Sequence, residues 1–135
     1  MSKPGDPAGE PSWEVLVVDD EQALLTAYST VLRAAGHRIE LAEDGEVARE
    51  LVQKRSFDVI LSDINMPGMD GGDVSKALHA HPEVRTIPVL FLTALISPSE
   101  LKQTGQQIGG RPAISKQAPL EELAKRVQQL IDRKA

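Results

Sequence analysis

The chain has 135 residues, of which 41% are hydrophobic and 26% are charged, and these proportions favour one folded domain over a disordered chain. Its formal net charge of −5 argues against nonspecific binding to nucleic acid or to an anionic membrane, because such binding needs clustered positive charge. Cysteine is absent, which excludes disulfides, thiol nucleophiles and Cys-ligated metal sites. With no signal peptide and no membrane-spanning run in the sequence, we expect an acidic cytoplasmic protein.

The predicted elements begin after an irregular lead-in. Residues 1–12 are rich in proline and glycine, so we predict that they are disordered and that residues 13–135 form the folded domain. Three continuous apolar runs in this domain indicate strands that are covered on both faces, and two weaker runs indicate two further strands. In chain order, the predicted strands are 15–18, 39–42, 59–61, 89–92 and 113–115.

Segments with a helical spacing of apolar residues separate the predicted strands. The first helix ends at Gly36, the second and third include residues 47–52 and 74–78, and the last includes residues 120–131. Ser97 and Glu100 predict a capping box at the start of a short fourth helix. This alternation predicts an α/β fold of the (βα)₅ type, a doubly wound parallel five-stranded sheet with helices on both faces.

Polar residues follow four of the predicted strands. They are, in chain order, the run Asp19-Asp20-Glu21, then Asp63, Thr93 and Lys116. Because the carboxyl ends of parallel strands meet at one edge of a sheet, we expect these side chains to converge. Two carboxylates about 4 Å apart repel by roughly 4 kcal/mol at an effective dielectric near 20, so the cluster suits a hard cation such as Mg²⁺. A carboxylate beside such a cation and a lysine can attack a phosphoryl group and form an aspartyl phosphate.

The chain resembles the receiver domain of two-component response regulators over residues 15–133. The resemblance rests on the segment DVILSDINMPGMDG at residues 58–71 and on three flanking pieces in the expected order, namely Asp19-Asp20-Glu21, Thr93-Ala94 and Lys116. One such piece would be weak evidence, whereas all four in order are strong. The resemblance implies a flavodoxin-like receiver topology of the stand-alone, single-domain type.

The resemblance also implies a phosphoacceptor and a metal site. Asp63 would accept the phosphoryl group from a histidine kinase or a histidine phosphotransfer protein. Asp20, Asp63 and the backbone carbonyl of Asn65 would ligate Mg²⁺, and Asp19 would act mainly through water. In the family, residues at the positions of Asn65 and Leu95 tune how fast the phosphate is lost.

Two further residues take roles from the family. Thr93 would be the switch hydroxyl, and Lys116 would contact the acceptor and then the phosphoryl oxygens. Two positions depart from the family pattern. Ala113 stands where the family usually has Tyr or Phe, which puts the usual coupling between switch hydroxyl and ring in question. Gln117 stands where the family usually has a cis proline, so we expect a trans bond and a rebuilt loop.

The expected function is that of a switch, and not of an enzyme beyond its own phosphorylation and dephosphorylation. Its output would be docking to a downstream protein, without binding nucleic acid or membrane, as a monomer or weak dimer. Two alternatives stay open: a docking module that works without phosphorylation, and a receiver fragment of a larger hybrid kinase or regulator. An aspartate-nucleophile phosphatase fits poorly, because Asn65 stands where a second acid–base Asp is needed.

Simpler interpretations of single residues remain. The acidic run at residues 19–21, taken alone, is typical of a helix start. Lys116 is also compatible with an ordinary surface lysine. We interpret His37, His79 and His81 as solvated surface residues.

Overall fold

The computed structural model describes residues 13–63, 65–66, 69–70, 87–108 and 111–134. Their elements are, in chain order, β1 (Glu14–Val18), α1 (Gln22–Ala34), β2 (Arg38–Ala42), α2 (Gly45–Lys54), β3 (Val59–Asp63), β4 (Asn65–Met66), β5 (Met69–Asp70), β6 (Val89–Thr93), α4 (Pro98–Gln103), β7 (Gln107–Ile108), β8 (Arg111–Ser115) and α5 (Leu120–Lys134). The predicted lead-in at residues 1–12 and the predicted helix near residues 74–78 lie outside the described residues. No helix in the described part is long and apolar enough to cross a membrane.

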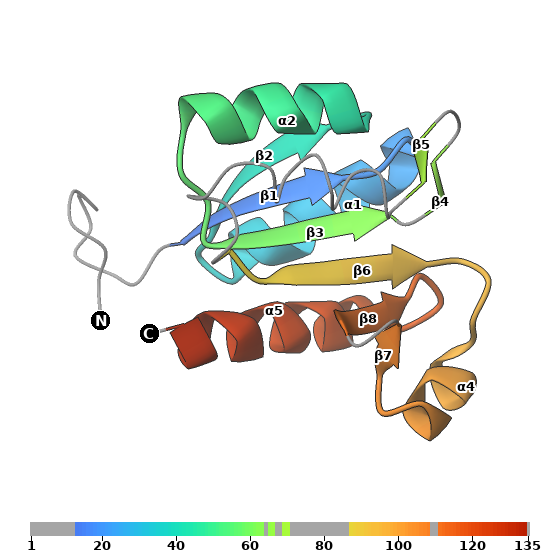
Figure 1. Ribbon diagram of the computed structural model, residues 1–135. Helices are drawn as coiled ribbons and strands as arrows, with labels where there is room; N and C mark the ends of the chain where they lie inside the picture. The colour runs from blue at the N-terminus through green and yellow to red at the C-terminus, as the bar shows by residue number, and fades with distance from the viewer. Residues whose placement is uncertain (1–12, 64, 67–68, 71–86, 109–110, 135) are drawn as a thin grey trace.

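A parallel sheet forms the centre of the molecule (Figure 1). The strand order is β2-β1-β3-β6-β8-β7, and every neighbouring pair from β2 to β8 is parallel. The predicted doubly wound parallel sheet is thereby confirmed. Two features go beyond the prediction: β7 pairs antiparallel with the edge of β8, and β4 and β5 form a separate antiparallel pair.

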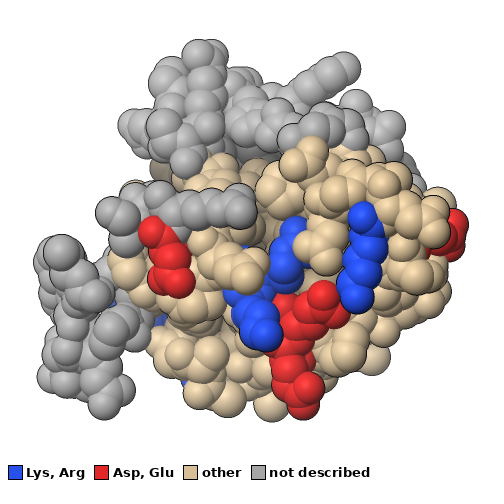
Figure 2. Space-filling view, turned by 90° about the horizontal axis from the view of Figure 1, so that it is seen from below, with Lys and Arg blue, Asp and Glu red and all other residues tan. Residues whose placement is uncertain are grey.

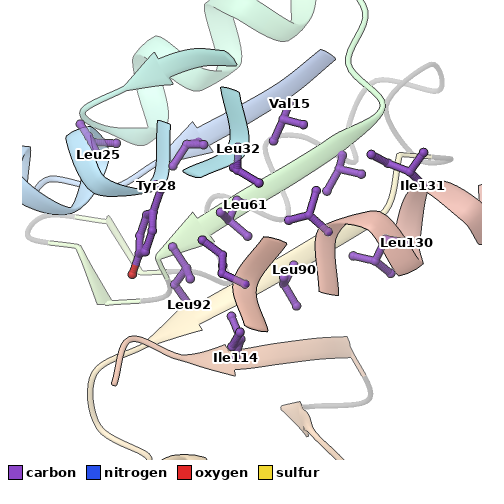
Figure 3. Packing of buried hydrophobic residues seen from close by; sticks show 14 residues of the cluster. Val15, Leu25, Tyr28, Leu32, Leu61, Leu90, Leu92, Ile114, Leu130 and Ile131 are labelled. Carbon is purple, nitrogen blue, oxygen red and sulfur yellow. The ribbon is translucent and has the colours of Figure 1, made fainter. Parts of the chain in front are cut away.

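Both faces of the sheet are covered, which explains why its central strands are continuously apolar. Along β1, Val15 and Val17 pack with residues of α1 and α5, whereas Leu16 and Val18 pack with residues of α2 and α4. Figure 3 shows the first of these two layers, in which side chains of α1 and α5 meet the strands. Since successive side chains of a strand point to opposite faces, a strand between two helical layers needs an apolar residue at every position.

Local sequence signals mark the start of α4 and the end of α1. Ser97 Oγ accepts a hydrogen bond from the backbone N–H of Glu100, whose carboxylate accepts one from the backbone N–H of Ser97, so the predicted capping box is confirmed. Gly36 follows α1 with a φ of 96°, a left-handed conformation that glycine adopts without steric cost.

The interpretation of His37 as a solvated residue is wrong. His37 is only 5% exposed, and neither ring nitrogen has a hydrogen-bond partner among the described residues. The reason lies in the turn: Gly36 reverses the chain, and the backbone N–H of His37 donates to the carbonyl of Leu32, so residue 37 folds back under α1. The other two histidines lie outside the described residues.

Candidate functional site

The parallel register brings the predicted polar residues to one edge of the sheet. Asp19 directly follows β1, Asp63 and Thr93 are the last residues of β3 and β6, and Lys116 directly follows β8. Asp63 pairs with Leu92 across the ladder, so the end of β3 lies one residue from Thr93 on the neighbouring strand. The structure thus assembles at one edge the residues that the sequence places at four strand ends.

Lys116 contacts three carboxylates at this edge of the sheet. Its Nζ donates hydrogen bonds to Asp63 Oδ2 at 3.0 Å and to Glu21 Oε1 at 2.9 Å, and it lies 2.9 Å from Asp19 Oδ2 in an ion pair. The lysine side chain is 7% exposed. The simpler interpretation of Lys116 as a surface lysine is therefore wrong. Burial alone would lower its pKa, but the hydrogen bonds to the carboxylates outweigh burial and raise the pKa, so the ammonium stays charged.

Four carboxylates form an acidic cluster around this lysine. Ligand oxygens of Asp19, Asp20, Glu21 and Asp63 all lie within 4.8 Å of one another. Asp19 and Asp63 are buried, whereas Asp20 and Glu21 are exposed. The cluster therefore combines two carboxylates that water cannot solvate with two that it can.

Asp19 provides a test of whether this cluster fits a metal ion. Its Oδ1 accepts a hydrogen bond from the backbone N–H of Glu21 at 2.9 Å, and its buried Oδ2 forms the ion pair with Lys116 Nζ at 2.9 Å. Burial raises the pKa of Asp19, and the hydrogen bond from Glu21 and the charge of Lys116 oppose that rise. The ammonium of Lys116 offsets only part of the charge of four carboxylates, and a set of carboxylate oxygens of this kind fits Mg²⁺.

The loop after β8 keeps Lys116 in place without the proline that the family usually has. No cis peptide bond occurs in the described residues, so Lys116–Gln117 is trans, as predicted. The backbone N–H of Lys116 donates to the carbonyl of Thr93 at 2.7 Å, and that of Gln117 donates to Ser115 Oγ at 3.1 Å. These bonds tie the loop to β6 and to the end of β8, which lets the lysine reach Asp63.

The region of the predicted switch is closely packed. Thr93 is fully buried, and its hydroxyl oxygen accepts a hydrogen bond from the backbone N–H of Leu95 at 3.1 Å. Ala113 is also fully buried, in the apolar cluster that includes Leu101, and its carbonyl accepts a hydrogen bond from Arg126 of α5. Leu95 itself is 77% exposed.

Two residues at or near the site were given no role from the sequence. Glu21 was placed at this edge as one member of an acidic run, and nothing in that pattern indicates that it contacts Lys116. Tyr28 of α1 is 3% exposed, and its hydroxyl has no hydrogen-bond partner in the described part of the chain. Burial, and next the charge of Asp19, raise the pKa of Tyr28 to about 12. Figure 3 shows its oxygen directed toward the end of the sheet at which β3 ends.

The remaining predicted ligand is described only in part. Asn65 lies in β4 and pairs with Asp70 of β5. Its position, two residues beyond Asp63, is near the site in sequence. The role of its backbone carbonyl stays a prediction.

The chemistry of the edge follows from these contacts. A buried carboxylate, Asp63, faces an ammonium that stays charged, among oxygens that suit a divalent cation. Such an arrangement can hold a phosphoryl group and neutralise its oxygens, because charge-assisted hydrogen bonds and cations stabilise transferring phosphoryl groups.

Comparison with known proteins agrees with this chemistry. The family described as response regulator receiver domain matches residues 15–128. The chain is 36% identical over 117 residues to the gliding motility regulatory protein of Myxococcus xanthus and 34% identical over 119 residues to response regulator MprA of Mycobacterium sp. (strain KMS). These alignments cover 86% and 88% of the chain but 15% and 50% of those two proteins. The chain thus spans half or less of their length.

Solved structures give the same result over nearly their whole length. Chemotaxis response regulator CheY4 of Vibrio cholerae is 37% identical, with a TM-score of 0.75 over 88% of this chain and 98% of that one. The receiver domain of sensor histidine kinase PA1611 from Pseudomonas aeruginosa is 27% identical, with a TM-score of 0.76 over 90% and 98% of the two chains. That structure is described as having a magnesium ion coordinated in its active site cleft.

Proposed function

The chain belongs to the response regulator receiver domain family of two-component signalling, and from this premise we propose that it is a switch controlled by phosphorylation of Asp63. The observation that carries the proposal is the contact of 3.0 Å between Lys116 Nζ and Asp63 Oδ2 within a cluster of four carboxylates. A buried aspartate with a charged lysine on one side and a set of metal-type ligands on the other is equipped to become an aspartyl phosphate.

The proposed donor is a phosphohistidine of a histidine kinase or a histidine phosphotransfer protein. An oxygen of ionised Asp63 attacks the phosphorus, and the new P–O bond forms as the P–N bond of the donor breaks. The departing imidazole nitrogen keeps the electron pair of that bond and takes a proton from solvent. Attack by water on the phosphorus later returns the Asp63 carboxylate and inorganic phosphate.

Lys116 and Thr93 receive the transferred group. Lys116 stays beside Asp63 and donates to a phosphoryl oxygen, which offsets its negative charge. Thr93 lies on the neighbouring strand, one residue beyond the partner of Asp63, and its hydroxyl donates to another phosphoryl oxygen in the product. The Thr93 oxygen accepts from Leu95, so the hydroxyl proton stays available for this bond.

The residues that would hold Mg²⁺ are Asp20, Asp63 and the backbone carbonyl of Asn65, with Asp19 acting mainly through water. When bound, the ion supplies positive charge to the oxygens of the transferring group. The cluster of Asp19, Asp20, Glu21 and Asp63 supports this assignment, because the ammonium of Lys116 offsets only part of its negative charge. The magnesium ion in the similar receiver of PA1611 supports it as well.

The proposed output is docking to a downstream protein in the cytoplasm, with the chain as a monomer or a weak dimer that catalyses no reaction beyond its own phosphorylation cycle. Figure 2 shows the side of the molecule on which α4 and α5 lie, where basic and acidic side chains meet at the centre. Mixed charges of this kind suit a protein partner better than nucleic acid or an anionic membrane, either of which needs a broad basic surface.

A second candidate function is docking without phosphorylation, and Ala113 favours it. Ala113 is fully buried in the cluster of Leu101, so this position carries no aromatic ring that could move with Thr93. If the switch does not follow phosphorylation, the chain still presents a fixed docking surface. The acidic cluster then only binds a cation.

Intact-mass spectrometry after incubation with acetyl phosphate, with and without Mg²⁺, tests the first proposal. We expect one added phosphoryl group that requires Mg²⁺, abolished by Asp63→Asn and greatly weakened by Asp20→Ala. Asp132→Asn is the matched control, since Asp132 lies on α5 and bonds to Gln128. Incorporation that survives Asp63→Asn would contradict the assignment. No adduct, and no binding of beryllofluoride to a protein that binds Mg²⁺, would favour the second candidate.

A further inference from the structure

We propose that Glu21 is a placeholder for the phosphoryl group: it occupies Lys116 while Asp63 is unphosphorylated and releases the lysine when phosphoryl oxygens arrive. This inference rests on the function proposed above, because it describes how the same site is held before use. Glu21 acts through Lys116 and is a positioning residue. No covalent bond to Glu21 is formed or broken.

The first step of the argument is that Lys116 has no spare contact. Carboxylate oxygens of three residues, Asp19, Glu21 and Asp63, lie within 3.0 Å of its Nζ. An ammonium group has three N–H donors. A phosphoryl oxygen therefore gains a full hydrogen bond from Lys116 only if one of these three carboxylates moves away.

The second step is that the three carboxylates differ in what it costs to release them. The side chains of Asp19 and Asp63 are 0% and 3% exposed, whereas that of Glu21 is 56% exposed. A buried carboxylate that loses its cation is left without solvation, but an exposed one is solvated by water at once. Asp63 also carries the phosphoryl group and so remains next to the lysine. Glu21 is the partner that can be exchanged.

The third step is that the Glu21 side chain serves the lysine and not the helix. Glu21 is the N-cap residue of α1, yet its side chain makes no capping hydrogen bond. Residues that stabilise a helix by capping are usually Ser, Thr, Asp or Asn, whose short side chains reach the first N–H groups. The side-chain hydrogen bond that the structure gives Glu21 is the one to Lys116. Glu21→Gln therefore removes the ion pair without removing a cap.

Calorimetric titration with beryllofluoride, an analogue of the phosphoryl group, tests this inference on the full chain at saturating Mg²⁺. We expect Glu21→Gln to lower the dissociation constant about two- to fivefold, since binding no longer has to break an exposed ion pair. In a Lys116→Gln background the same Glu21→Gln change is expected to have no effect. A merely structural role of Glu21 would not depend on Lys116 in this way.

Glu43→Gln is the matched control. Glu43 directly follows β2, at the same edge of the sheet, and its carboxylate accepts a hydrogen bond from Gln22. This variant removes the same charge near the site and leaves the contact between Glu21 and Lys116 in place. An equal gain in beryllofluoride affinity from Glu43→Gln would show that the loss of one negative charge near the site explains the effect of Glu21→Gln. This result would overturn the inference.

Two other results would also overturn it. Unchanged or weaker beryllofluoride binding by Glu21→Gln contradicts the placeholder role. A large loss of Mg²⁺ affinity in that variant also contradicts it, because such a loss would indicate that Glu21 is a metal ligand. If the unmodified protein binds Mg²⁺ but no beryllofluoride, the proposed function itself fails and the placeholder role fails with it. The two failures are distinguishable, because only the second removes binding by the unmodified protein.

Discussion

At the scale of single residues, the sequence predicts those site residues whose positions follow from the order of the strands, and it misses those whose positions depend on loops and side-chain conformations. Asp63 and Lys116 end predicted parallel strands, so topology brings them together whatever their side chains do. The contact of Glu21 with Lys116 depends on the path of a loop and on a side-chain conformation. The spacing of residues in the sequence predicts neither of them. The interpretation of His37 fails for a related reason: a position in a turn favours exposure, but the path of the chain after Gly36 buries this residue.

Tyr28 gives a prediction about stability. Its buried hydroxyl lacks a partner among the described residues, and an unsatisfied buried polar group costs about 1–3 kcal/mol. We expect Tyr28→Phe to keep the packing and to raise the free energy of unfolding by about 1 kcal/mol. Tyr28→Ala, which also removes the ring, is expected to lower it by about 3 kcal/mol or more. Urea denaturation at pH 7.5 measures both changes, and a destabilised Phe variant would mean that the hydroxyl has a partner.

His37 gives a prediction about pH. Burial lowers the pKa of His37, and the charge of Asp58 opposes this only in part. The unfolded chain therefore takes up a proton near the ordinary value of 6.5 while the folded protein does not, so stability falls as the pH drops below about 6.5, by at most about 1.4 kcal/mol per pH unit from this residue.

Urea denaturation between pH 7.5 and 5.5 checks the role of His37. We expect His37→Gln to lose this part of the pH dependence. The raised pKa of Asp19 acts in the opposite sense, because protonation at low pH then favours the folded state. It is present in both proteins, so the difference between them isolates His37. Equal slopes in the two proteins would contradict the prediction.

At the scale of elements, the strands that the sequence indicates most clearly are those with a continuous apolar run. In β1, β3 and β6 nearly every residue is buried, so the pattern is visible without knowledge of the fold. In contrast, β7 was not predicted, since Gln107 and Ile108 lie between glycines and read as a loop. These two residues form a strand because they pair with β8. This pairing is a tertiary contact, which a local sequence pattern cannot predict.

The packing around β8 predicts that the aromatic ring of the family cannot simply be restored. Ala113 is fully buried in contact with the cluster of Leu101, so a tyrosine at this position must displace its neighbours. We expect Ala113→Tyr to lower the free energy of unfolding by about 1–3 kcal/mol, the usual cost of overpacking. The same substitution at the exposed Ala35 serves as control and should change stability by less than about 0.5 kcal/mol. Denaturant unfolding compares the two variants, and an equally stable Ala113→Tyr would show that the pocket opens readily.

At the scale of the whole molecule, the acidic cluster links metal binding to stability. Oxygens of four carboxylates lie within 4.8 Å of one another, and they repel in the folded state more than in the unfolded chain. A cation that binds only the folded protein raises its stability, by about 2.7 kcal/mol at a concentration 100 times the dissociation constant. We expect thermal unfolding to shift to higher temperature in MgCl₂ and not in NaCl of equal ionic strength. Asp20→Ala should remove most of the shift, and a full shift in that variant would contradict the assignment of Asp20.

The contacts of Lys116 also have a consequence for how the protein folds. Lys116 meets Glu21 and Asp63 across 95 and 53 positions of the chain, so no segment can build this edge by itself. Contacts between distant segments form only after the entropy of closing long loops has been overcome, which makes parallel sheets slow to assemble. The site is therefore absent from any intermediate in which β8 has not yet docked. In a refolding experiment, recovery of beryllofluoride binding would mark the last step of assembly, later than the return of helical signal.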